Sequence, residues 1–178
     1  MGGATDREHP GPRSAVEGDS TRTSGRMARR LLLTLLLVVV LLGAGGAFGV
    51  RSGHVTNTAG GYTLGVTYPW IARSGLDVPW QVQVRHPGGF EEDIVIAVTA
   101  DYFDIFETQG FHPEPDSETA DGEFVYLTFT APPAGEVFRA DFDAYIQPAS
   151  QLGRTARVQL LVGGRPVAEV SYRTWLVP

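Results

Sequence analysis

The sequence predicts an all-β domain, folded as an antiparallel β-sandwich and preceded by one N-terminal transmembrane helix. Two observations indicate this arrangement: a run of twenty uncharged residues near the N-terminus, and an alternation of apolar and polar residues with a period of two that begins at Tyr62. The length of 178 residues suits one domain with appendages. The absence of cysteine excludes a disulfide framework, thiolate catalysis and cysteine-bound zinc.

The uncharged run is Leu31–Val50, in which thirteen of twenty residues are Leu, Val or Phe. Twenty helical residues rise about 30 Å, which is the thickness of the hydrocarbon core of a bilayer. The apolar residues favour insertion by about 4–8 kcal/mol in total. No polar stripe of the kind that a soluble helix carries interrupts the run. We therefore expect residues 31–50 to form a transmembrane helix that acts as a signal anchor.

A cleaved signal peptide is the alternative for this segment. Leu31–Leu42 would then be its apolar region, and the small residues of Gly43–Ala47 would offer a cleavage site. A retained anchor is favoured because the run has the full length of a bilayer span, whereas the apolar region of a signal peptide is shorter.

The flanking charges predict the direction of insertion. Arg26, Arg29 and Arg30 precede the run, and Arg51 is the one charge directly after it. The positive-inside rule then places residues 1–30 in the cytoplasm. We expect a single-pass protein of the cell membrane whose C-terminal domain lies outside.

The segments on either side of the run have simple compositions. Residues 1–30 hold almost no large apolar side chain and predict a disordered cytoplasmic tail, in which Met27 is an alternative start of the chain. Residues 51–61 are small and polar and predict a flexible linker that spans about 18 Å. The extracytoplasmic domain then covers residues 62–178.

Small residues recur near the end of the predicted span. Gly45 and Gly49 form a GxxxG pair, and Gly43 and Ala47 have the same spacing. This spacing lets two membrane helices approach closely, which predicts a homodimer through the transmembrane helix. The alternative is that glycine is simply frequent in a chain that holds 22 of them.

Seven segments alternate or are continuously apolar as strands do: residues 62–68, 80–85, 93–100, 124–130, 137–147, 155–162 and 167–177. The segment Gly163–Pro166 predicts a hairpin between the last two. In the segment that begins at Val137, five apolar residues from Phe138 to Ile146 share one face. Asp101–Thr108 predicts a short helical turn at one end of the sandwich.

The spaced strands, the strand tryptophan Trp80 and the closing segment ARVQLLVGGRPVAEVSYRTWLVP resemble bacterial immunoglobulin-like or fibronectin-III-like modules over residues 62–178. The cysteine pair of true immunoglobulin domains is missing. The layout is also similar to that of single-pass envelope proteins of arginine-rich, lysine-poor bacteria. This resemblance implies an immunoglobulin-like sandwich that serves adhesion, spacing or partner docking.

The segment Glu107–Glu123 is the densest group of potential ligands, with six acids and His112. Clustered carboxylates can bind calcium, which takes six to eight oxygens. A metal site is not predicted, because the spacing of a calcium-binding loop is absent and a solvated surface loop accounts for the segment. If calcium binds, the candidate ligands are Asp116, Glu118, Asp121 and Glu123.

Further sites for chemistry are scarce. Asp141 and Asp143 predict the wet face of a strand rather than an acid–base pair. The four histidines have no metal-ligand spacing, and no nucleophile elbow or phosphate loop is present, so no catalytic residue and no cofactor is predicted. Trp70 follows Pro69 in a predicted loop, and an exposed tryptophan beside the acidic segment predicts a partner contact.

The expected function is therefore that of a membrane-anchored, non-enzymatic β-sandwich that binds another envelope protein in a membrane complex. A secreted ligand-binding module for calcium or glycan is the alternative, and an enzyme with a loop-built site is a third hypothesis. Nucleic acid is not an expected partner, because the net charge is −6 and residues 51–178 hold sixteen acids against eight arginines.

Overall fold

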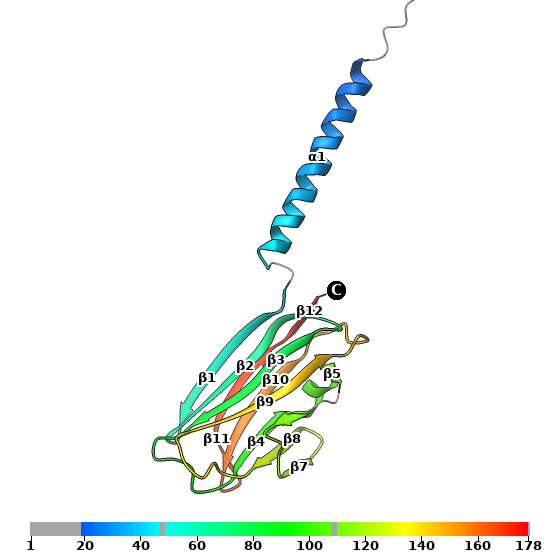
Figure 1. The fold of residues 1–178 in the computed structure, drawn as a ribbon. Helices are drawn as coiled ribbons and strands as arrows, with labels where there is room; N and C mark the ends of the chain where they lie inside the picture. The colour runs from blue at the N-terminus through cyan, green and yellow to red at the C-terminus, as the bar shows by residue number, and fades with distance from the viewer. Residues whose placement is uncertain (1–18, 47–48, 108–109, 178) are drawn as a thin grey trace, which may run out of the picture. The chain divides into compact units, whose positions relative to one another are not determined.

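The computed structural model describes residues 19–46, 49–107 and 110–177. The chain divides into two compact units, Met1–Phe48 and Gly49–Pro178. The first unit contains helix α1 (Asp19–Ala44), and the second contains strands β1 to β12 (Figure 1).

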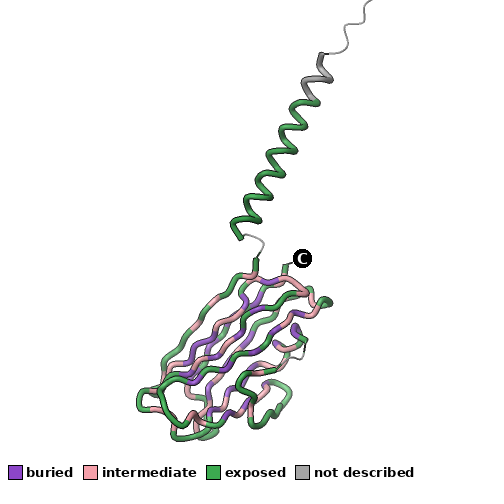
Figure 2. The backbone as a smooth tube through the Cα atoms, in the orientation of Figure 1, coloured by how far each residue is buried: buried purple, intermediate pink, exposed green. Residues whose placement is uncertain are grey.

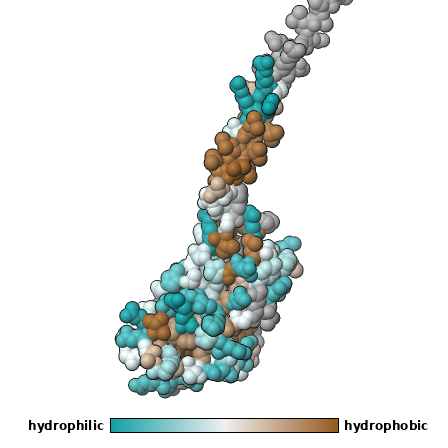
Figure 3. Space-filling view, in the orientation of Figure 1, coloured by the Kyte–Doolittle hydropathy of each residue, from teal (hydrophilic) through white to brown (hydrophobic). Residues whose placement is uncertain are grey.

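Helix α1 is long and apolar enough to cross a membrane. Its segment Gly25–Ala44 has 20 residues and a mean hydropathy of 2.1, and none of it is buried. The leucines and valines from Leu31 to Leu42 are 45–68% exposed, and they form a continuous apolar surface (Figure 3). The helix begins at Asp19, so the prediction of a disordered tail is wrong for residues 19–30, where the helix continues past the apolar run. The rest of the predicted tail, residues 1–18, lies outside the described residues.

The helix ends earlier than predicted, at Ala44 rather than Val50. The Gly45 N–H donates to the Leu41 carbonyl over 2.9 Å, and Gly46 has a φ of +72°. Glycine readily adopts this left-handed conformation, which closes a helix C-terminus. Gly45 and Gly49 therefore lie beyond the helix, and the packing of two helices through this GxxxG pair stays a prediction. Ala47 lies outside the described residues.

Residues 51–61 are not a flexible linker, which corrects the prediction for this segment. They form strand β1 (Arg51–Ala59) and a turn at Gly60 and Gly61, both with positive φ. Strand β1 pairs along its whole length with the antiparallel strand β2 (Tyr62–Arg73). The pairing uses backbone groups, so a polar edge strand needs few apolar side chains. The Asn57 amide also donates to the Glu169 carbonyl over 2.8 Å, which links β1 to the second sheet.

The strands form two sheets (Figure 1). The first has the order β1-β2-β3-β9-β5, with β6 also paired to β9 and β12 also paired to β2. Its remaining strands are β3 (Asp77–Arg85), β9 (Val137–Ile146), β5 (Phe106–Glu107), β6 (Phe111–His112) and β12 (Trp175–Val177). The second has the order β11-β10-β4-β8-β7. Its strands are β11 (Arg165–Arg173), β10 (Thr155–Val162), β4 (Ile94–Thr99), β8 (Phe124–Phe129) and β7 (Ser117–Ala120). All pairings are antiparallel except that of β12 with β2.

One apolar core draws buried residues from both sheets, and Figure 2 shows buried positions spaced along the strands. On β9 the five predicted inward residues from Phe138 to Ile146 are buried, and the exposed residues of the strand alternate with them. The β10–β11 hairpin turns at Gly163 and Gly164, both with positive φ, as predicted. The short helical turn predicted at Asp101–Thr108 is confirmed for residues 101–105, within the 3-10 helix η1 (Ala100–Ile105), whereas Phe106 and Glu107 form β5.

A chain of hydrogen bonds crosses the core between the sheets. The Trp80 indole Nε1–H donates to the Tyr172 hydroxyl over 2.6 Å. Tyr172 hydrogen-bonds in turn to Tyr102, and the Tyr102 hydroxyl lies 2.8 Å from Thr174 Oγ1. Burial raises the pKa of both tyrosines well above the ordinary value, so both remain neutral donors at physiological pH. The chain joins β3, β11, η1 and the junction between β11 and β12.

Replacing Tyr172 by phenylalanine tests this hydrogen-bond chain. The Tyr172→Phe variant keeps the ring that stacks on Tyr68 with centroids 4.1 Å apart, but it leaves the buried Trp80 N–H without its acceptor. We expect a loss of about 1–3 kcal/mol in the free energy of unfolding, measured by denaturant titration in detergent. Tyr62→Phe is the control, because Tyr62 is only partly buried. Equal stability of the two variants would contradict the role assigned to the chain.

Candidate functional site

A pocket of about 180 Å³ opens at the edge that β5 and β6 form on the first sheet and β7 forms on the second. We call it the edge pocket. Its lining comes from η1, β5, β6, β7, β8 and β9 and consists of four phenylalanines, one valine and two glutamates: Phe103, Phe106, Glu107, Phe111, Glu118, Val125 and Phe142. It lies where the two sheets are covered only by short strands.

The phenylalanines of the edge pocket pack on one another and on the core. Phe142 is buried, and its ring centroid lies 4.7 Å from that of Phe111 and 5.6 Å from that of Phe103. Phe103 and Phe111 both contact Trp80 edge-on, with centroids 6.3 and 6.1 Å from the indole. Such contacts add about 0.5–1.5 kcal/mol per aromatic pair beyond area burial. The pocket is therefore an aromatic extension of the core that is partly open to solvent.

The charge of the edge pocket has one sign. Glu107 and Glu118 are its two ionisable lining residues, and both are exposed. A carboxylate pair next to aromatic rings attracts a cation, because the ring faces carry negative partial charge. The volume is below the roughly 300 Å³ of a drug-sized ligand site. The chemistry therefore fits one cationic side chain with an apolar stem, such as arginine or lysine.

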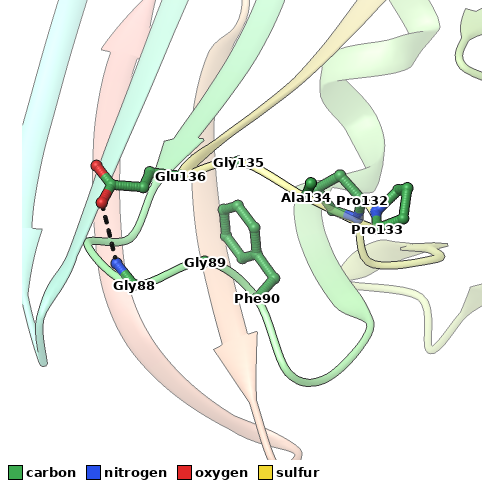
Figure 4. Close-up of a pocket in the computed structure, with 8 residues that line it drawn as sticks. All are labelled: Gly88, Gly89, Phe90, Pro132, Pro133, Ala134, Gly135 and Glu136. Atoms are coloured by element: carbon green, nitrogen blue, oxygen red, sulfur yellow. Dashed lines mark hydrogen bonds between the residues drawn. The ribbon is translucent and has the colours of Figure 1, made fainter.

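A second pocket, of about 290 Å³, lies between the β3–β4 and β8–β9 loops (Figure 4). It is lined by Gly88, Gly89, Phe90 and residues 132–136, and Glu136 is its one ionisable lining residue. That carboxylate accepts a hydrogen bond from the Gly88 N–H over 3.2 Å and lies 3.8 Å from the Arg85 guanidinium. With its one carboxylate already bound to the loop, this pocket offers a ligand little beyond backbone groups and a phenyl ring.

The four candidate calcium ligands have separate positions in the structure. Asp116 accepts hydrogen bonds from the Thr130 N–H and hydroxyl, and Glu123 forms an ion pair with Arg157. Glu118 lines the edge pocket. Among the residues that the structure describes, no group of three or more acids or histidines could hold a metal ion.

Asp121, the fourth candidate, shapes the turn between β7 and β8. Its Oδ1 accepts from the backbone N–H of Phe124 over 2.8 Å and of Glu123 over 2.9 Å. Its Oδ2 accepts from the Tyr126 hydroxyl over 2.7 Å. These bonds favour the ionised carboxylate, and the Phe124 N–H contributes most, so the pKa of Asp121 is lowered. Asp121 therefore has a structural role in this turn.

Other residues that could carry chemistry are spread across the surface. His54 Nδ1 lies 3.2 Å from the hydroxyl of Thr67, its cross-strand neighbour on β2. His86 Nδ1 bonds to the Gly89 carbonyl over 2.6 Å, and His112 lies on β6 opposite Asp141. The pair of His54 and Thr67 is a cross-strand contact outside the described pockets. Absence of enzymatic activity stays a prediction.

Trp70 is 45% exposed, as expected for a contact residue. Its predicted surroundings are wrong, however. It lies in strand β2 rather than in a loop, and strands β3 and β9 separate it from the acidic segment. The edge pocket escapes prediction, because six elements supply its lining and no local pattern links Phe103 to Phe142. The sequence signal was Phe106, which directly precedes the acidic segment, and Phe111, which lies within it.

The lowered pKa of Asp121 predicts a pH-dependent contribution to stability. A carboxyl with a lowered folded-state pKa stabilises the fold above its unfolded pKa of about 3.9. That contribution disappears as the pH falls through the folded-state pKa. We expect Asp121→Asn to lower the denaturation midpoint at pH 7, and the difference from the parent to narrow below about pH 4. Asp93→Asn, at an exposed aspartate before β4, is the control, and a pH-independent difference for Asp121→Asn would contradict this assignment.

Comparison with known proteins adds no relative from which a function could be transferred. No family model matches the chain, and no curated protein is similar to it. A proposal of function therefore rests on three features of the chain itself: the apolar helix α1, the edge pocket, and the distribution of charge over the β unit.

Proposed function

We propose that the protein is a membrane-anchored, non-enzymatic module that presents an extracytoplasmic immunoglobulin-like β-sandwich for protein–protein interaction in a membrane complex. The observation that carries this proposal is the exposed apolar surface of α1. Apolar surface in water is unfavourable by about 25 cal/mol per Å². A helix apolar on every side is stable when hydrocarbon surrounds it.

The orientation follows from the charges next to the span. Arg26, Arg29 and Arg30 lie in the first turns of the segment Gly25–Ala44, and Arg51 is the first charged residue after it. Positive charge is retained on the cytoplasmic side. The N-terminus is therefore cytoplasmic and the β unit lies outside the cell membrane.

Three features support an immunoglobulin-like arrangement of the β unit. Its strands form two mainly antiparallel sheets around one core. A strand tryptophan, Trp80, is buried at the centre of that core. Its indole N–H is bound by Tyr172 on the opposite sheet, which joins the two layers in a chain without cysteine.

The edge pocket is the proposed contact for the partner protein. Its four phenylalanines can surround an apolar stem, and the exposed Glu107 and Glu118 of its lining can pair with a cationic head. The proposed partner is therefore an envelope protein that inserts an arginine or lysine side chain. A buried anchor of this kind is typical of residues that dominate the energy of an interface.

A charge in the middle of α1 tests the anchor. An arginine at the centre of a span costs roughly 2.5–3.5 kcal/mol, and Leu36→Arg also removes a favourable leucine. We expect the variant to move from the carbonate-resistant membrane fraction to the soluble fraction. Val137→Arg is the matched control, because Val137 is 44% exposed on the β unit. Mass spectrometry of the parent protein after detergent extraction should still detect residues 31–50. A mature product that begins after residue 47 would instead favour a cleaved, secreted module.

Site-specific photocrosslinking tests the edge pocket. A photoreactive residue at position 118 of the full chain in membranes should give one discrete protein adduct. The same residue at position 169, on the strand at the opposite edge of that sheet, should not. Glu107→Lys should abolish the adduct at 118 by repelling the cationic side chain, and Glu114→Lys, outside the pocket lining, should leave it unchanged. Equal adducts from both positions, or no effect of Glu107→Lys, would rule the pocket out as the contact.

A further inference from the structure

The end of the β unit at which β1 begins has its own surface, which we call the proximal end. It comprises residues 49–52, 70–77, 147–154 and 173–177. Arg51 of β1 and Trp175 of β12 both pair with Ile71, one on each side of β2. The Ser74 hydroxyl donates to the Ser150 carbonyl, and the Thr174 N–H donates to the Arg154 carbonyl over 2.9 Å. These bonds hold four distant segments of the chain together at this end.

Exposed apolar side chains are concentrated at the proximal end. The described part of the β unit has six exposed large hydrophobic residues, and one of them, Val137, lies at the opposite end, where β9 begins. The other five are on the proximal end: Trp70, Leu76, Leu152, Trp175 and Val177. Figure 3 shows a patch of hydrophobic residues at the end of the β unit where β1 begins. Clustering of this kind marks an interaction surface, whereas single exposed hydrophobics do not.

The charges of the β unit are segregated in the same way. The proximal end holds four arginines, at positions 51, 73, 154 and 173, and a single acid, Asp77, which is a net charge of +3. The rest of residues 51–178 holds four arginines and fifteen acids, a net of −11. The Arg173 guanidinium also lies over the Trp175 ring, 4.1 Å from its centroid. The proximal end therefore combines tryptophan with positive charge on a domain that is otherwise acidic.

We propose that the proximal end docks on the bilayer itself, with Trp70 and Trp175 in the interfacial zone and the arginines on anionic lipid headgroups. This inference rests on the proposed function in one respect, that α1 spans the membrane. Six residues separate Ala44, the last of the helix, from Arg51, so the seven Cα-to-Cα steps of extended chain reach at most about 25 Å. A tether of this length keeps the proximal end, to which Arg51 belongs, within reach of the headgroups.

The chemistry of the surface matches an anionic interface. Tryptophan is enriched at membrane–water boundaries because its ring is apolar and its N–H is polar. Arginine is attracted to anionic headgroups within a Debye length of about 8–10 Å. The net charge of −11 on the remainder of the domain is repelled from the same headgroups. The attraction and the repulsion both favour one orientation, with the proximal end towards the lipid.

The three tryptophans make this proposal measurable in the full chain, because residues 1–69 contain none. The protein is reconstituted into vesicles of phosphatidylcholine and phosphatidylglycerol, some with lipids brominated near the headgroup. We expect the brominated lipids to quench the fluorescence of Trp70 and Trp175. The Trp70→Phe/Trp175→Phe variant retains only Trp80, which is 2% exposed, and should lose this lipid-dependent quenching.

The outcomes separate this inference from the proposed function. Failure of the protein to float with the vesicles would overturn both. Stable incorporation without lipid quenching, with Trp70 and Trp175 accessible to aqueous acrylamide, would overturn the docking alone. Protection from acrylamide without lipid quenching, or protection that grows with protein density, would assign the surface to a protein partner or a second copy and would also overturn it.

A charge reversal tests the role of the arginines. Arg154→Glu changes the proximal end, and Arg165→Glu makes the same change of net charge at the far end of β11, which runs from Arg165 to the proximal Arg173. We expect Arg154→Glu to reduce the quenching of Trp175 by brominated lipid in anionic vesicles, and Arg165→Glu to leave it unchanged. Equal quenching of the two variants would overturn the electrostatic part of the proposal. Quenching of the parent protein that is as strong in vesicles without phosphatidylglycerol as in anionic vesicles would overturn it as well.

Discussion

The hydrogen-bond chain from Trp80 through Tyr172 and Tyr102 to Thr174 is the constraint on which the β unit depends. It places four polar groups in a core where an unpaired one would cost about 1–3 kcal/mol. Each group finds a partner only when the two sheets and helix η1 adopt one mutual position. Apolar packing alone tolerates small shifts of one layer over the other, whereas directional hydrogen bonds do not. These hydrogen bonds therefore fix the position of one layer over the other, as a disulfide does in many small secreted domains.

The same chain explains how the last strand changes sheets. Thr174, fully buried, separates β11 of the second sheet from β12 of the first. Its carbonyl lies so close to Gly153 that a Cβ on that glycine would stand 1.9 Å from the oxygen. A glycine is required there because the two backbones touch. The crossing brings Trp175 beside β2 and so creates the apolar part of the proximal end.

The sequence predicts correctly those elements in which a local pattern of residues shows which side chains are buried or where the chain turns. Strand β9 and the β10–β11 hairpin belong to this class, because every second residue or a Gly-Gly turn marks them. Strand β1 does not, because backbone pairing with β2 stabilises it and its side chains are mostly exposed. The helix was predicted to reach Val50 because the segment is uncharged and apolar. It ends at Ala44, because four glycines lie from position 43 to position 49 and glycine disfavours a helix. The edge pocket depends on contacts between six elements, which no local pattern encodes.

The two proposed surfaces require opposite charge, and the fold keeps them apart. The edge pocket uses Glu107 and Glu118 to attract a cation, whereas the proximal end uses arginines to attract anions. None of the residues that line the edge pocket belongs to the proximal end, so contact with lipid leaves the pocket open. Holding the domain at the bilayer also restricts a membrane partner and the pocket to a thin layer, which raises their effective concentration. A pocket for a single side chain, too small for strong binding alone, can then be sufficient for a specific complex within the membrane plane.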